Sequence, residues 1–251
     1  MTIRIAMWSG PRNISTAMMR AWENRPDTSV SDEPFYAAYL ALTDIEHPMN
    51  DEVLASQPQD WREVAAAMTG PAPDDADIWF QKHMTHHMVA RIGRDWFGDV
   101  RHAFLIRDPA QVVASYATKR ETVTPLDLGY DLQAELFDEV VARTGQTPPV
   151  LESSDVLRNP QGALTALCQA LDVPFDPTML SWPAGPRVSD GVWAKHWFAS
   201  VEASTGFRPW QAPAITLGEE QNAVAQTCQP AYRRLSRFRL EIPADVPEDC
   251  R

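Results

Sequence analysis

Segment 7–20 constrains the fold of this chain more than any other feature. It ends a short apolar run, and after a turn at Gly10 it continues with a helical pattern. The first backbone N–H groups of a helix have no intrahelical partner and carry about half a positive charge. A strand, a tight turn and a helix start therefore predict an anion site, to which Arg12, Ser15 and Thr16 add side-chain donors.

The turn lacks the groups that grip a magnesium-bound triphosphate. In the pattern Gly-x4-Gly-Lys-[Ser/Thr], the Lys holds the terminal phosphates and the hydroxyl ligates Mg²⁺. Counted from Gly10, Ser15 stands at the position of the second Gly, Thr16 at that of the Lys and Ala17 at that of the hydroxyl. We therefore expect a phosphate-binding loop that works without a metal ion. The alternative is an ordinary capped helix that follows an edge strand.

A second strand-to-helix junction begins at Arg107. Residues 102–106 form a buried-strand pattern, and Pro109 suits the first turn of the helix that follows. Arg107 then lies at the carboxyl end of a strand and Ser115 on the second helical turn. A guanidinium binds phosphate through two parallel hydrogen bonds, so this junction predicts a second anion site. Alternatively, Arg107 pairs with Asp108 or caps a helix.

The two junctions resemble those of sulfotransferases that use 3′-phosphoadenylyl sulfate (PAPS) as donor. The family's 5′-phosphosulfate loop reads Pro-[Lys/Arg]-Ser-Gly-[Ser/Thr]-Thr, and here residues 11–16 read Pro-Arg-Asn-Ile-Ser-Thr. The family holds the 3′-phosphate with an Arg that ends a strand and a Ser eight residues later, a spacing that Arg107 and Ser115 reproduce. The resemblance assigns to the donor Gly10, Pro11, Arg12, Asn13, Ile14, Ser15, Thr16, Arg107 and Ser115, and more loosely Arg187 in a later loop.

Two loop positions depart from the family pattern. Asn13 replaces the usual Ser, and Ile14 replaces the usual Gly. Because a β-branched residue tolerates a positive φ poorly, we expect the backbone at Ile14 to avoid that region. Leu151 also stands where the family has a Tyr, which removes that ring as a contact to adenine.

Candidate catalytic groups follow the strand at 78–83. The resemblance implies a Lys-x-His segment here, with His as the base toward the acceptor and Lys near the leaving oxygen. In this chain Lys82 and His83 are adjacent, and neighbours on a strand point to opposite faces. Either His83 is the base and Lys82 faces away, or Lys82 is in place and His86 or His87 supplies the base. A surface histidine patch or a zinc site is the alternative.

Glu33 is a further candidate base at the end of the second predicted strand. Some protein-directed sulfotransferases use an acidic base in this region. The competing interpretation is that Pro34 begins a helix and that Asp32 and Glu33 cap it. Arg12 is the candidate for stabilising the charge that develops on the bridging oxygen during transfer.

The alternation of strands and helices predicts a three-layer α/β fold, with a mostly parallel central sheet covered by helices on both faces. The resemblance makes it a P-loop nucleotide-binding type, and we expect one domain over residues 1–251. Segment 121–130 is a candidate lid, 242–251 a loosely held tail, and the aromatic stretch 193–198 either core or acceptor pocket. We expect strands at 3–8, 28–31, 78–83, 102–106 and 149–152, and helices near 15–25, 34–43, 60–68, 109–119, 131–144, 160–171 and 218–236.

The composition narrows the possible partners. A formal net charge of −12 argues against a nucleic-acid binder, and there is no apolar run of the length, about twenty residues, that a membrane span needs. The three cysteines lack metal-ligand spacing and Cys168 falls on an apolar helical face, so we expect reduced thiols and a cytoplasmic protein.

The resemblance implies transfer of a sulfuryl group from PAPS to a hydroxyl or amine without metal, giving adenosine 3′,5′-bisphosphate (PAP). A kinase-like phosphotransferase and a non-catalytic nucleotide-binding protein are the alternatives, and the acceptor and oligomeric state are not predicted.

Overall fold

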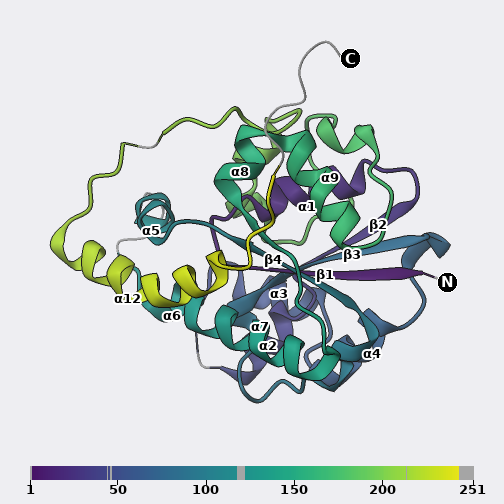
Figure 1. Ribbon diagram of the computed structural model, residues 1–251. Coiled ribbons are helices and arrows are strands. Elements are labelled where there is room, and N and C mark those ends of the chain that lie inside the picture. The colour runs from purple at the N-terminus through teal and green to yellow at the C-terminus, as the bar shows by residue number, and fades with distance from the viewer. Residues whose placement is uncertain (1, 44, 46, 118–121, 213, 243–251) are drawn as a thin grey trace, which may run out of the picture.

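The computed structural model describes residues 2–43, 45, 47–117, 122–212 and 214–242. Its centre is a five-stranded sheet in the order β2-β3-β1-β4-β5, and every neighbouring pair of strands is parallel (Figure 1). The strands are β1 (Ile3–Ser9), β2 (Thr28–Asp32), β3 (Ile78–Met84), β4 (Arg101–Ile106) and β5 (Val150–Glu152). All five carboxyl ends therefore meet at one edge of the sheet.

Helices cover both faces of the sheet, as the sequence predicts. Helices α1, α8 and α9 lie on one face, and α2, α3, α4 and α7 lie on the other (Figure 1). The described helices are α1 (Ser15–Glu23), α2 (Tyr36–Leu42), α3 (Asn50–Ser56), α4 (Trp61–Thr69), α5 (Pro109–Ala117), α6 (Pro125–Leu128), α7 (Tyr130–Thr144), α8 (Ser153–Arg158), α9 (Pro160–Ala170), α10 (Ala194–Trp197), α11 (Ala199–Glu202) and α12 (Glu219–Ser236). The α/β fold prediction is confirmed, while α3 and the short helices α6, α8, α10 and α11 were not predicted.

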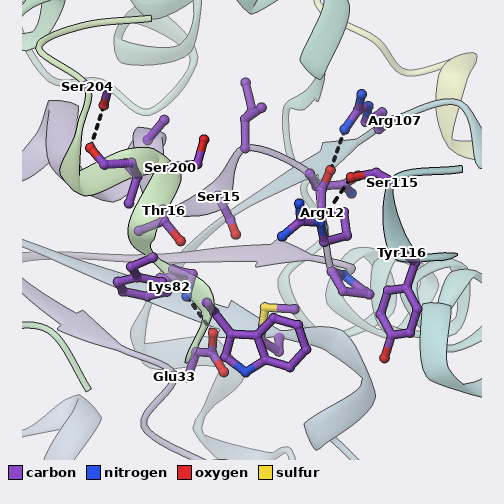
Figure 2. Close-up of a pocket in the computed structure, with 18 of the residues that line it drawn as sticks. Arg12, Ser15, Thr16, Glu33, Lys82, Arg107, Ser115, Tyr116, Ser200 and Ser204 are labelled. Atoms are coloured by element: carbon purple, nitrogen blue, oxygen red, sulfur yellow. Dashed lines mark hydrogen bonds and ion pairs between the residues drawn. The ribbon is translucent and has the colours of Figure 1, made fainter. Parts of the chain in front are cut away.

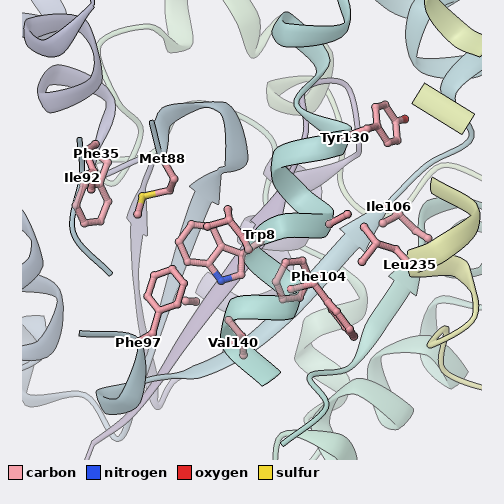
Figure 3. Close-up of a cluster of buried hydrophobic side chains, with 14 of the residues drawn as sticks. Trp8, Phe35, Met88, Ile92, Phe97, Phe104, Ile106, Tyr130, Val140 and Leu235 are labelled. Carbon is pink, nitrogen blue, oxygen red and sulfur yellow. The ribbon is translucent and has the colours of Figure 1, made fainter. Parts of the chain in front are cut away.

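Strand β1 divides the core into two clusters, because its successive side chains point to opposite faces. Ala6 and Trp8 enter one cluster, which also contains side chains of α7 and α12. Ile5 and Met7 enter the other, together with side chains of α1 and α9. Figure 3 shows Trp8 at the centre of the first cluster. The same alternation in β3 decides which side chains can reach the site.

The sequence also predicted a lid over residues 121–130 and a loosely held tail over residues 242–251. The candidate lid begins at Glu121 and the expected loose tail includes 243–251, and these positions lie outside the described residues. Within the described part, α6 and Gly129 occupy most of the remaining lid segment.

Cys168 is buried at 1% exposure, and burial raises the pKa of its thiol to about 11. Among the described residues, no helix has both the length and the apolar character to cross a bilayer.

Candidate functional site

A cavity of about 390 Å³ opens at the carboxyl edge of the sheet. It is lined by loop 11–17, by groups at the ends of β2 and β3, by Arg107 and α5, and by segment 197–208. Figure 2 shows Ser15 and Thr16 between the Lys82 and Glu33 pair on one side and segment 200–204 on the other. Ligands bind at this edge in open parallel sheets.

The phosphate loop is held in a conformation that the sequence did not predict. Ile14 adopts a left-handed conformation, with φ 58° and ψ 14°, and it is the N-cap residue of α1. The expectation that Ile14 avoids positive φ is therefore wrong. Tertiary contacts impose the strain, because Asn13 is buried and its Nδ2 donates to the Leu105 carbonyl at 3.1 Å. Helix α1 has no side-chain cap, so its first N–H groups remain available to an anion.

Gly10 lets this loop lie against another backbone segment. A Cβ at this position would lie 2.7 Å from the Leu128 carbonyl oxygen, so a larger residue would displace the loop. Gly10 itself does not line the cavity; it acts through the course of the backbone.

Arg12, Arg107 and Ser115 come together in the structure. Arg12 Nε donates to Ser115 Oγ at 3.0 Å, and Arg107 Nη1 donates to the Arg12 carbonyl at 2.7 Å (Figure 2). Across the described ranges, neither arginine forms an ion pair with a carboxylate. Burial lowers the pKa of both guanidiniums, and Arg12 contributes to this lowering at Arg107. Two adjacent, partly buried cations without a counter-ion form a site for a multiply charged anion.

Lys82 and Glu33 form the opposite end of the cavity. Lys82 Nζ lies 2.6 Å from Asp32 Oδ1 and 2.5 Å from Glu33 Oε1. Burial raises the pKa of Glu33 to about 7, with Lys82 opposing this rise and Asp32 reinforcing it. Burial alone would lower the pKa of Lys82, but the two carboxylates outweigh it and raise that pKa. The capping interpretation of Asp32 and Glu33 is wrong, since both bind Lys82 and α2 begins only at Tyr36.

The histidines separate between the two faces of the sheet. His83 does not line the cavity. On the face of the sheet away from the cavity, it stacks on Trp8 at 4.6 Å between ring centroids and contacts Gln81. Its expected position beside the acceptor is therefore wrong, because Lys82 occupies the cavity side of β3. Burial, with a contribution from His102, lowers the pKa of His83 to about 3. His86 and His87 do line the cavity, and His87 Nε2 lies 4.0 Å from Glu33 Oε2.

Arg187 is also placed away from the cavity. Its Nη2 donates to the Pro183 carbonyl at 3.0 Å and its Nε lies 3.9 Å from Glu23. The loop around it is anchored by Asp190, which forms a buried ion pair with Arg20 at 2.7 Å. In this structure the Arg187 loop packs against α1 and not into the cavity, and the looser assignment of Arg187 to the donor stays a prediction.

Comparison with known proteins decides the family. The family model described as "Sulfotransferase domain" matches residues 3–237. This chain belongs to that family. It is 30% identical over 234 residues to "Branched-chain-amino-acid aminotransferase-like protein 2" of Arabidopsis thaliana, covering 92% of this chain and 41% of the relative. It is 33% identical over 206 residues to the corresponding protein 1 of that plant, covering 81% of this chain and 36% of the relative.

The chain thus spans well under half the length of these two curated relatives. Solved structures share its fold at low sequence identity. A sulfotransferase from Alicyclobacillus acidocaldarius aligns over the whole of both chains with a TM-score of 0.56 and 11% identity. The sulfotransferase domain of the Synechococcus PCC 7002 olefin synthase aligns with a TM-score of 0.51 and 16% identity, over 90% of this chain and 94% of that one.

Segment 197–208 lines the cavity, and the part of it that follows the aromatic stretch 193–198 was not predicted from the sequence. It contributes Trp197, Phe198 and Arg208 to the lining, and a separate loop contributes His47. The aromatic stretch 193–198 divides between two roles, because Trp193 is a core residue at 1% exposure. No periodic or motif pattern marks residues 200–208 in the sequence. Only the aromatic cluster before them gave any signal.

Proposed function

We propose that this sulfotransferase-family chain binds PAPS and transfers its sulfuryl group to an acceptor in the same cavity. The observation that carries the proposal is the pair of partly buried arginines, without carboxylate partners, beside the uncapped start of α1. Such a site favours a ligand with two separate anionic groups, and the 5′ and 3′ phosphates of PAPS are such groups. The loop also lacks the Lys and hydroxyl that a magnesium-bound triphosphate needs.

The residues divide into roles by position. Ser15, Thr16 and the amides that begin α1 would hold the 5′ side, together with the backbone of loop residues 10–14. Arg107 and Ser115 would hold the 3′-phosphate. Arg12, whose side chain already contacts Ser115, would lie between the two groups. When bound, PAPS would supply an activated sulfuryl group bonded to a phosphate leaving group.

Glu33 and Lys82 would act at the acceptor end. Glu33 is the proposed base, since it lines the cavity and a carboxylate with a pKa of about 7 suits proton removal near neutral pH. Lys82 stays protonated because its pKa is raised, so it can stabilise negative charge near the transferred group. Of the histidines left open by the sequence, His87 is a weak base, because burial, His86 and His47 lower its pKa well below the usual value.

Calorimetry with PAP, compared with ATP and Mg²⁺, tests this proposal. We expect PAP to bind and ATP with Mg²⁺ to bind far more weakly. Arg12→Ala and Arg107→Ala should each weaken PAP binding by about 10- to 100-fold, since each removes charge-assisted hydrogen bonds. Arg187→Ala is the matched control, and it should leave the affinity unchanged.

The proposal fails if wild-type protein does not bind PAP, or if both cavity variants bind it as tightly as the control does. Tighter binding of ATP with Mg²⁺ would instead favour a kinase-like phosphotransferase. PAP binding without transfer to any acceptor would favour a non-catalytic nucleotide-binding protein.

A further inference from the structure

When Glu33 is ionised, the acceptor end of the cavity carries one more negative charge than positive. Two carboxylates, Asp32 and Glu33, share the single ammonium group of Lys82. The second oxygen of Asp32 is occupied, because Gly191 N–H donates to it at 3.2 Å. The second oxygen of Glu33 lies 4.0 Å from His87 Nε2, which is beyond hydrogen-bond distance. Glu33 is about nine-tenths buried and lines the cavity, so this oxygen is open to a ligand.

Neither His87 nor His83 supplies a further cation to Glu33. His87 is neutral because burial lowers its pKa, and His83 lies on the other face of the sheet. Arg12 and Arg107 belong to the donor end; Figure 2 shows Glu33 and Arg107 at opposite ends of the residues drawn. A cationic ligand group bound to Glu33 from the cavity would balance the excess negative charge of the two carboxylates at this largely buried position.

Aromatic rings line the same part of the cavity. Tyr36, Trp197 and Phe198 contribute to its walls, and the Phe198 ring centroid lies 5.3 Å from Lys82 Nζ. Ring faces attract cations as well as apolar groups. A ligand that pairs an ammonium group with an apolar body therefore fits both the charge and the walls.

We infer that the acceptor is a primary amine, bound as its ammonium ion by Glu33, and that its nitrogen is the atom sulfurylated. This inference rests on the proposed function and specifies its acceptor. Glu33 takes one proton from the ammonium, and the nitrogen lone pair then forms an N–S bond. The S–O bond to the phosphate of PAPS breaks, and its electron pair stays on the phosphate oxygen of PAP. The nitrogen releases a second proton to solvent, which leaves a sulfamate.

An amine suits this site better than a hydroxyl because only one carboxylate oxygen is open. That oxygen can bind an ammonium group directly, whereas His87 beside it is a weak base because burial lowers its pKa. The relative acidities of the two kinds of acceptor also favour an amine. An ammonium is far more acidic than an alcohol, so a carboxylate of the strength of Glu33 removes its proton more readily.

Matched acceptors test the inference. The wild-type protein saturated with PAP is titrated with 2-phenylethylamine and with 2-phenylethanol, which differ only in the polar group. We expect the amine to bind at least about tenfold more tightly, as for a hydrogen bond between charged groups. With PAPS present, mass spectrometry should detect the sulfamate in excess over the sulfate ester.

Variants separate recognition by Glu33 from general damage. Glu33→Gln should bring the two affinities within about threefold of each other, and Glu33→Asp should retain part of the preference because it keeps the charge. Glu63→Gln, on the exposed side of α4, should behave as wild type. Retained PAP affinity in each variant shows that the donor end is intact.

Equal binding of amine and alcohol by a protein that binds PAP would overturn the inference and leave the proposed function standing. The same holds if Glu33→Gln keeps the amine preference, or if only the sulfate ester forms. Failure of PAP itself to bind would instead overturn the proposed function.

Discussion

Glu33→Gln should reduce the loss of stability that the protein shows between pH 5.5 and pH 8, although Glu33 is proposed to be needed for activity. Burial holds the pKa of Glu33 at about 7 in the folded chain, against an ordinary value of 4.5. Between these values the folded protein keeps a proton that the unfolded chain has lost. Because the folded pKa is raised, this contribution to stability is present below pH 4.5 and is lost as pH rises through 7.

The size of the effect follows from the difference between the two pKa values. Each pKa unit corresponds to about 1.4 kcal/mol, so ionising Glu33 in the folded state costs about 3 kcal/mol in total. About 2 kcal/mol of that falls between pH 5.5 and pH 8. Gln does not titrate, and Lys82 keeps its contact with Asp32 in the variant. The variant should therefore gain about 2 kcal/mol relative to wild type over this interval.

Urea unfolding of both proteins at pH 5.5 and pH 8 measures this gain. Titrating groups that do not contact Glu33 are common to both proteins and cancel in the comparison, and Asp32 supports the charge of Lys82 in both. Glu63→Gln, which alters an exposed side chain, should show no pH-dependent difference from wild type. A Glu33→Gln effect that is the same at both pH values would refute the idea that Glu33 ionises at a cost in the folded state.

Two further substitutions probe the supports of the site. Gly10→Ala should weaken PAP binding and lower stability by about 1–3 kcal/mol, since its Cβ would clash with the Leu128 carbonyl. Gly98→Ala, which has open space around its Cβ, is the control and should change neither quantity. Thermal unfolding and calorimetry compare the two variants, and equal effects would contradict the clash. Asp190→Asn should cost about 3 kcal/mol in urea unfolding by breaking the buried pair with Arg20, but leave PAP affinity unchanged. A loss of PAP affinity there would mean that the Arg187 loop contributes to the donor site.

The sequence by itself determined the order of strands and helices along the chain and the positions of the two strand-to-helix junctions. These features are local: apolar runs of strand length, a Gly and Pro turn, and a Pro that begins a helix leave their signal in neighbouring residues. Arg107 and Ser115 could be related because one strand end and one helix fix their separation. The short helices gave too little periodicity to be predicted, and segment 200–208 carries no motif that marks it as cavity lining.

Tertiary structure decided what the local patterns left open. The pleat of β3 sets Lys82 and His83 on opposite faces, but only the packing of Trp8 and Phe35 around His83 determines which face is the cavity. Ile14 takes a left-handed backbone against its own preference because the buried Asn13 anchor fixes the loop. Glu33 becomes a poised carboxylate because the fold brings it, Asp32 and Lys82 together from two strands, and burial then raises its pKa. Such charge sharing depends on distances across the sheet, which no spacing along the chain encodes.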